Sequence, residues 1–253
     1  MKVDFSATAT DYAKHRPGFP DSLFNRLSEY GIGLPGQKIV DLGTGTGTLA
    51  RGLAARGSDV IGLDPSAAML QQATQLSESA QLKVNYRVAT AENTGLPSAS
   101  TDVVTAGQCW HWFDRPRAVQ EVARILKVNG CIAIAHFDWI RSKGNIAEAT
   151  EQLIEAHNPD WSMGGRHGLY PTCLRDLNEG GFKEIQTFSY DVFVPFTHED
   201  WRGRIRTTAG VGASLTPDKV ELFDQELAAL LQTNYPTPML QVHHRVWVAI
   251  ASL

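Results

Sequence analysis

The most constraining feature of the sequence is the run KIVDLGTGTGTL at residues 38–49. Its first five residues are largely apolar and β-branched, which predicts a short strand, and a helical pattern opens at Leu49. Between the two stand three glycines at alternate positions, Gly43, Gly45 and Gly47. Glycines let backbone approach a ligand without Cβ atoms, and a helix start offers unpaired N–H groups. The run therefore predicts a strand, a glycine turn and a helix start built to hold a ligand.

A second short strand, expected at residues 59–63, follows this unit, and Asp64 stands directly at its end. An acid at the carboxyl end of such a strand can accept both hydroxyls of a ribose, so the ligand is expected to be a nucleoside. The dinucleotide fingerprint is G-x-G-x-x-G, whereas the spacing here is G-x-G-x-G and Asp41 stands just before the loop. A carboxylate there would repel a pyrophosphate but suits an ammonium group. A nucleoside with an amino-acid tail is S-adenosylmethionine (SAM).

At these residues the sequence resembles the class I SAM-dependent methyltransferases, in particular the small-molecule branch with the ubiquinone/menaquinone-biosynthesis and trans-aconitate types. The stretch VDLGTGTGTLARGLA is similar to their first motif and VIGLDPSAAML to their second. The resemblance is specific over about the first 140 residues and only architectural beyond them. It implies SAM as the cofactor.

The repeating strand–helix–strand pattern predicts an α/β fold with parallel strands and right-handed crossovers. Strands are expected at 38–42, 59–63, 84–88, 102–106 and 131–137, and helices at 48–56, 66–77 and 115–127. Further on, the patterns predict a helix at 172–180, one or two strands at 182–196, a helix at 217–232 and a strand at 242–251. The resemblance completes this to a Rossmann-like, doubly wound, seven-stranded sheet, mostly parallel with an antiparallel last strand and helices on both faces.

The length of 253 residues fits a single domain, residues 1–253. Within it we expect an N-terminal lid at 1–36, a SAM-binding core at 37–138, and substrate-covering segments at 139–170 and 197–235. The first covering segment is read as loop-rich.

The net charge of −4 gives no overall basic excess, so no nucleic-acid partner is expected. The arginines at 202, 204 and 206 are interpreted as a solvated helix face or loop. Three widely spaced cysteines without a CxxC pair suggest neither a disulfide framework nor a metal site. The start of the sequence lacks the apolar core of a signal peptide, and no apolar run of about 18 residues exists to span a membrane. A cytoplasmic protein is expected.

The resemblance implies a set of cofactor contacts that lie in the two motifs, in the segment before the first strand and after the third and fourth strands. These residues are Tyr12, Arg16, Asp41, Gly43, Gly45, Gly47, Asp64, Pro65, Met69, Thr90, Ala91, Glu92 and Gln108. Thr90 stands where the family usually has an Asp, so a hydroxyl replaces a charged contact to adenine. The alternative for Tyr12 and Arg16 is a frayed leader, and for residues 90–92 an ordinary polar loop.

The stretch GQCWHWFD at 107–114 places three aromatic residues and a histidine at a strand's carboxyl end, which predicts a pocket wall. The substrate is expected to contact Trp110, Trp112, Trp139 and Arg166, the last as a bidentate partner of a carboxylate. The alternative for Arg166 is an ordinary surface arginine. His111 is the candidate catalytic residue, either as a general base or as a hydrogen-bonded wall residue. Cys109 is interpreted as buried bulk.

These features favour methyl transfer to a small-molecule acceptor, a carboxylate or another oxygen nucleophile, catalysed mainly by positioning. The alternatives are a non-catalytic SAM-binding regulator and a nicotinamide-dependent oxidoreductase. The loop spacing and Asp41 speak against the oxidoreductase.

Overall fold

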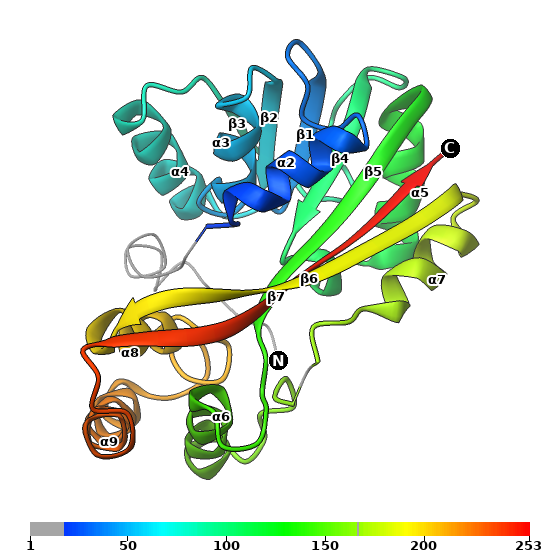
Figure 1. The fold of residues 1–253 in the computed structure, drawn as a ribbon. Helices are drawn as coiled ribbons and strands as arrows, with labels where there is room; N and C mark the ends of the chain where they lie inside the picture. Colours follow the sequence, from blue (N-terminus) through cyan, green and yellow to red (C-terminus); the bar gives the residue numbers. More distant parts are fainter. Residues whose placement is uncertain (1–17, 166) are drawn as a thin grey trace. The chain divides into compact units, whose positions relative to one another are not determined.

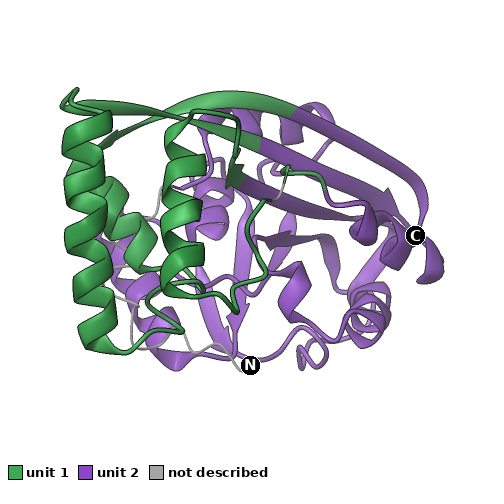
Figure 2. Cartoon of the chain, turned by 90° about the horizontal axis from the view of Figure 1, so that it is seen from below, with its two compact units in different colours: residues 1–17, 138–169, 190–245 green, residues 18–137, 170–189, 246–253 purple. Residues whose placement is uncertain are grey.

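The computed structural model describes residues 18–165 and 167–253, which group into two compact units (Figure 2). Unit 2 contains residues 18–137, 170–189 and 246–253. The described part of unit 1 contains residues 138–165, 167–169 and 190–245. Each unit is treated by itself below. Unit 1 largely coincides with the two stretches predicted to cover the substrate, whereas the expectation of one domain over 1–253 stays a prediction.

The strands form a single seven-stranded sheet in the order β3-β2-β1-β4-β5-β7-β6 (Figure 1). They are β1 (Lys38–Leu42), β2 (Asp59–Asp64), β3 (Asn85–Val88), β4 (Thr101–Gly107), β5 (Leu126–Trp139), β6 (Lys183–Thr197) and β7 (Met239–Ser252). Strands β1 to β5 pair in parallel, and the last strands make the antiparallel end. The predicted mostly parallel, Rossmann-like sheet is confirmed.

Helices lie before, between and after the parallel strands of unit 2. They are α2 (Asp21–Glu29), α3 (Thr48–Ala54), α4 (Ala67–Ser79), α5 (Arg115–Ile125) and α7 (Pro171–Glu179), with a short 3₁₀ turn η2 (Trp110–Trp112). From β1 the chain steps outward through β2 to β3, and from β4 it steps the other way to β5. Right-handed crossovers in opposite directions place α3 and α4 on one face of the sheet and α5 on the other. The order reverses between β1 and β4, the point where ligands bind in such sheets.

The core of unit 2 follows from the apolar runs of its central strands. Four of the five residues of β1 and five of the seven residues of β4 are buried, as expected of strands covered on both faces. Helix α5 adds Ala118, Val119, Val122 and Ile125, which repeat at the spacing of one helix face. Burial of each large apolar side chain stabilises the fold by roughly 1.5–3 kcal/mol. The core holds the ends of β1, β2 and β4 in fixed positions.

Unit 1 is built on α6 (Ile146–His157), α8 (His198–Arg206) and α9 (Pro217–Asn234). Phe223, Leu227 and Leu231 lie four residues apart along α9 and are fully buried, in a cluster with Trp201 and Ile205 of α8. Helix α9 packs against both α6 and α8. The apolar stripe of α9 therefore organises this unit.

Two expectations about local structure differ in detail from the structure. The loop-rich stretch 139–170 also contains helix α6, which begins after Asn145, whose side chain accepts from the Glu148 N–H at 2.9 Å, while Glu148 accepts from Gly144 N–H at 2.6 Å. This reciprocal cap starts a helix. The helix expected at 115–127 ends at Ile125, since Leu126 is extended (φ −67°, ψ 139°) and begins β5.

Within the described part of the chain, none of the helices combines the length and the apolar character needed to cross a bilayer.

Candidate functional site

Asp41 lies at the carboxyl end of β1 and is 1% exposed. Its two carboxylate oxygens accept hydrogen bonds from the hydroxyls of Thr44 (2.6 Å) and Thr105 (2.8 Å). Thr105 is its register partner on β4, so the β1–β4 pairing aims this donor. Burial raises the pKa of Asp41 to about 6, opposed by the two hydroxyls and reinforced by the nearby charge of Asp64. A carboxylate held this way is a strong partner for a cation.

The glycine loop after β1 has the backbone that only glycine adopts easily. Gly43, Gly45 and Gly47 have φ of 58°, 56° and 78°, in the left-handed region. At Gly47 a Cβ would stand 2.2 Å from the Tyr86 hydroxyl, so the loop is also too tightly packed for any side chain there. The predicted turn is confirmed, with Gly47 as the residue before α3.

Asp64 ends β2 beside this loop. One oxygen accepts from Gly45 N–H and the other from Ser66 N–H, both at 2.9 Å. Burial raises its pKa while these two N–H groups oppose the rise. Each carboxylate oxygen has a second lone pair, which leaves capacity for two hydroxyl donors. The fixed carboxylate therefore fits the ribose contact expected from the sequence.

Other predicted cofactor residues surround this pair in unit 2. Met69, in the first turn of α4, is buried, and its methyl group faces Gly45. Pro65 is exposed beside it. Gln108 has a left-handed backbone (φ 61°), its N–H donates to Ala135 O at 2.9 Å, and its side-chain amide donates to Phe137 O. Gln108 is thus fixed to β5 by both its backbone and its side chain.

The loop after β3 contains Thr90, Ala91 and Glu92. Ala91 is buried and Thr90 exposed. The Glu92 carboxylate accepts from Asp114 N–H at 2.8 Å and so links this loop to the start of α5. An adenine contact by these three residues stays a prediction. Glu92 would make it with the same carboxylate that accepts from Asp114 N–H.

The aromatic stretch after β4 divides by exposure. Trp110 is fully buried in the core and its indole N–H donates to Asp176 at 3.0 Å, a position that favours packing, whereas Trp112 is 43% exposed. The His111 ring lies 4.6 Å from the Trp112 ring. Cys109 is buried, and its thiol pKa is raised well above the usual value by burial, which supports its interpretation as bulk.

Sequence reasoning missed a second histidine near His111. His136, on β5 and 1% exposed, has its ring 6.0 Å from that of His111 and stacks on Tyr170 at 3.5 Å with an interplanar angle of 12°. The alternation of β5 places His136 on one face of the strand, but only the fold shows that this face meets His111 and Tyr170. The pair supplies two imidazoles at the carboxyl ends of β4 and β5.

The remaining predicted residues lie elsewhere. Trp139 belongs to unit 1, where its indole N–H donates to Glu151 at 2.7 Å. Tyr12, Arg16 and Arg166 lie outside the described residues. No group of three or more His, Cys, Asp or Glu residues that could hold a metal ion occurs in residues 18–165 or 167–253.

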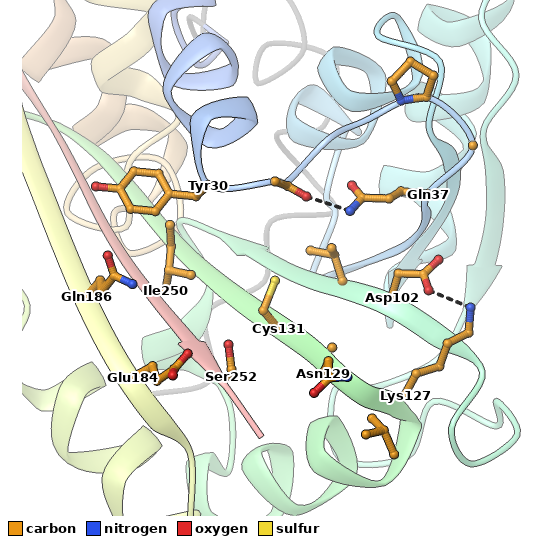
Figure 3. A pocket seen from close by; sticks show the side chains of 16 residues that line it. Tyr30, Gln37, Asp102, Lys127, Asn129, Cys131, Glu184, Gln186, Ile250 and Ser252 are labelled. Carbon is orange, nitrogen blue, oxygen red and sulfur yellow. Dashed lines mark hydrogen bonds and ion pairs between the residues drawn. The ribbon is translucent and has the colours of Figure 1, made fainter.

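A polar pocket of about 640 Å³ occurs in unit 2, near the amino ends of the parallel strands (Figure 3). Its lining includes Gln37, just before β1, and Asp102, near the start of β4. The Lys127 ammonium donates to Asp102 at 2.6 Å, and Gln37 donates to Gly31 O at 2.7 Å. Because the candidate cofactor residues stand at the strands' carboxyl ends, this pocket is separate from them.

Comparison with known proteins bears on the same segment. Residues 40–134 match the methyltransferase domain family. An uncharacterized methyltransferase of Mycobacterium tuberculosis is 32% identical over 152 residues, 58% of this chain and 59% of that protein, so the chain spans less than two thirds of this relative. The malonyl-[acyl-carrier protein] O-methyltransferase of Brevibacillus brevis is 26% identical over 85% of this chain and 80% of its own. The solved structure of a proposed type II methyltransferase from Anaeromyxobacter dehalogenans has a TM-score of 0.64 at 26% identity, covering 94% of this chain and 97% of that one.

Proposed function

From the premise that residues 40–134 belong to the methyltransferase domain family, whose class uses SAM, we propose that the chain transfers a methyl group from SAM to a small-molecule acceptor. The observation that carries this proposal is the constellation of Asp41, the left-handed glycine loop and Asp64 at the point where the strand order reverses. Asp64 would accept the ribose hydroxyls, and Asp41 would face the ammonium group of the methionine tail. No pyrophosphate would be tolerated so close to Asp41.

Bound SAM supplies a methyl group on a sulfonium, which is already an activated electrophile. The protein's task is then to align the acceptor, exclude water and hold the cofactor still. Gln108, fixed through both its backbone and its side chain, and the Cys109–Phe113 segment would form the rigid wall against which the acceptor is aligned. Trp112 and His111 are the members of this segment with side chains outside the core.

We propose a carboxylate or another oxygen nucleophile as the acceptor group. The malonyl-[acyl-carrier protein] O-methyltransferase among the relatives supports this class, since its printed name specifies O-methylation. A carboxylate attacks without losing a proton, so positioning suffices. A phenol or amine would need a base, and His111 is the candidate.

We further propose that the protein is cytoplasmic and that it has no nucleic-acid partner. Its three cysteines are all free thiols, as in reducing compartments, and its net charge is −4. The competing proposals are a SAM-binding regulator without catalysis and, less well supported, a nicotinamide-dependent oxidoreductase. A regulator would bind SAM but release no S-adenosylhomocysteine with any acceptor.

Replacing Asp64 by Ala tests the cofactor contact. The substitution removes the acceptor for two ribose hydroxyls, and hydrogen bonds to a charged group contribute about 1.5–3 kcal/mol each. We expect SAM affinity, measured by calorimetry, to fall at least tenfold. Asp59→Ala, at the exposed opposite end of the same strand, is the matched control and should bind as the parent does. Equal affinity of the Asp64 variant and the parent would contradict the ribose assignment.

Replacing His111 by Phe tests the base. With an acceptor found by screening carboxylates, phenols and amines, SAM binding should persist, since the ring is not assigned to the cofactor. Turnover should fall by roughly 10²–10⁴-fold if His111 removes a proton from the acceptor, and little if the acceptor is a carboxylate. The pH profile of kcat separates a general base from a wall residue. If His111 is the base, the profile of the parent contains its titration and the profile of the variant does not.

A further inference from the structure

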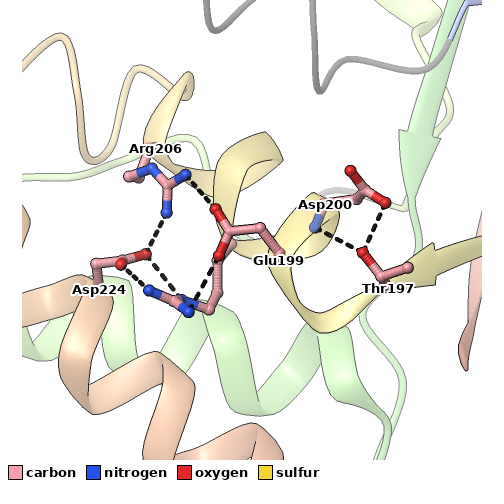
Figure 4. A network of polar contacts seen from close by, with 6 residues as sticks. Thr197, Glu199, Asp200, Arg206 and Asp224 are labelled. Atoms are coloured by element: carbon pink, nitrogen blue, oxygen red, sulfur yellow. Dashed lines mark hydrogen bonds and ion pairs between the residues drawn. The ribbon is translucent and has the colours of Figure 1, made fainter. Parts of the chain in front are cut away.

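The three arginines of helix α8 make contacts within unit 1. Arg202 and Arg206 both pair with Asp224 of α9 (Figure 4). Arg204 is only 5% exposed, and its guanidinium carbon lies 5.0 Å from the centre of the Trp139 ring. The interpretation of these arginines as a solvated helix face or loop was therefore wrong for Arg204. These contacts fasten the elements of unit 1, whereas one side chain of unit 2 links three elements at the candidate cofactor site.

That side chain is Tyr86, which is half-buried in the otherwise exposed edge strand β3. It pairs in register with Gly62 of β2. A Cβ added at Gly62 would stand 2.7 Å from Cδ1 and 2.8 Å from Cε1 of the Tyr86 ring, closer than packed atoms approach. The φ of Gly62 is not positive, so the backbone there does not require glycine. Gly62 therefore makes room for the Tyr86 ring.

The hydroxyl end of Tyr86 reaches the glycine loop and α4. Its oxygen occupies the space that a Cβ of Gly47 would need. It also shares a hydrogen bond of 2.9 Å with the hydroxyl of Ser77, which is 3% exposed on α4. Burial raises the pKa of Tyr86, so the phenol is neutral near pH 7 and keeps its proton for hydrogen bonding. Tyr86 thus packs against β2, α4 and the end of the glycine loop.

The glycine loop and Asp64 must keep a fixed separation if one ligand is to contact both. At the start of the loop, Thr44 N–H donates to Leu63 O and Gly45 N–H donates to the Asp64 carboxylate, both at 2.9 Å. At the end of the loop, the Tyr86 side chain bridges to β2. Glycine-rich backbone has more conformational freedom to lose than any other, and a loop that is ordered in advance binds its ligand without that cost. Tyr86 therefore orders the part of the loop next to α3.

We propose that Tyr86 is a positioning residue of the cofactor site, which packs between β2 and the glycine loop and holds the loop at the distance from Asp64 that the cofactor needs. The inference rests on the proposed binding of SAM at Asp41, the loop and Asp64. Tyr86 acts through Gly47 and Gly62, and no contact of its own with the cofactor is assigned to it. A role in stability alone would leave the affinity of the folded protein unchanged, so affinity and stability separate the two roles.

The test is calorimetric binding of S-adenosylhomocysteine, with circular dichroism to confirm folding and urea unfolding to measure stability. Tyr86→Phe removes only the hydroxyl beside Gly47, and Tyr86→Val removes the ring but keeps a residue type that favours strands. Ile125→Val, at the buried last position of α5, is the control, because it destabilises the core without touching the loop. Hydrogen exchange of the peptide that spans residues 42–49 reports the order of the loop without any ligand.

We expect Tyr86→Phe to weaken binding by about 3- to 10-fold and Tyr86→Val by about 10- to 100-fold. The amides of residues 42–49 should exchange faster in both variants than in the parent. Ile125→Val should unfold at a lower urea concentration than the parent but match it in affinity and in loop exchange. If Tyr86→Val does not fold, Tyr86→Phe decides by the same criterion.

Parent-like affinity in the folded Tyr86 variants overturns the inference, as does an equal loss of affinity in Ile125→Val. Failure of the parent to bind S-adenosylhomocysteine would instead overturn the proposed function. The exchange of residues 42–49 does not depend on a ligand, and unchanged exchange in the Tyr86 variants would by itself overturn the positioning role.

Discussion

At the scale of single residues, Asp41 is a buried ionisable group at the candidate cofactor site. Its carboxyl is buried and its pKa is raised to about 6, so at neutral pH the fold carries an ionised group that burial disfavours. The sequence predicted Asp41, the glycines and Asp64 as neighbours, because they lie in two local motifs. Thr105 could not be predicted as a donor to Asp41, because that contact depends on the β1–β4 register over 64 residues.

Replacing Asp41 by Asn should stabilise the protein without cofactor near pH 7.5. Because the native pKa is above the unfolded value of 3.8, stability falls as pH rises from about 4 to about 6, and the cost is fully present above that range. Its size is on the order of 2–3 kcal/mol, and the neutral amide avoids it. Urea unfolding at pH 7.5 and pH 4 measures the difference, which should vanish at the lower pH. SAM affinity should fall in the same variant, and a variant less stable than the parent at both pH values would contradict this account.

At the scale of elements, loops near the site are fastened to helices by single side chains. Glu121 of α5 accepts from the N–H (2.9 Å) and hydroxyl (2.5 Å) of Thr94, in the loop after β3, and from Arg124 at 2.7 Å. The Arg124 guanidinium is the largest cause that holds the pKa of Glu121 down at about 2. The loop that carries the predicted adenine contacts is therefore held by α5.

Replacing Glu121 by Gln should destabilise the fold by about 1–3 kcal/mol at pH 7, because a charged acceptor of two hydrogen bonds from Thr94 and two from Arg124 becomes neutral. The native pKa lies below the unfolded value of 4.5, so the contribution of Glu121 is present above pH 4.5 and is lost as pH falls towards 2. The gap between variant and parent should accordingly narrow in acid. Glu78→Gln, at an exposed site on α4, is the control. Equal unfolding midpoints of parent and Glu121→Gln at pH 7 would contradict this role.

Most elements were predictable because their signals are local. Helices α4 and α5 were expected at 66–77 and 115–127, and in the structure they begin at Ala67 and Arg115, after the N-caps Ser66 and Asp114. Helices α6 and α8 were missed although their caps stand in the sequence, Asn145 with Glu148 and Thr197 with Asp200. The aromatic and basic residues of 139–170 favoured a loop interpretation there, and for residues 202–206 a helix face and a loop both stayed open. The burial of Arg204 could not be predicted from the sequence, because it depends on how α8 packs in unit 1.

At the scale of the whole chain, the parallel strands were predictable from the strand–helix alternation, and the number of seven strands only from the family resemblance. The division of the described residues into two compact units was not predictable, because it arises from contacts between distant segments. Those contacts also create the pairing of His111 with His136 and of Arg204 with Trp139. Cofactor chemistry was therefore readable from local motifs, and acceptor chemistry was not.

The central claim is that this chain binds a nucleoside with an amino-acid tail through Asp41, the glycine loop and Asp64. Parallel calorimetric titrations with SAM, S-adenosylhomocysteine and NADH test it most directly. The account predicts binding of both sulfur nucleosides and none of NADH, because Asp41 would repel the pyrophosphate. Binding of NADH alone would contradict it.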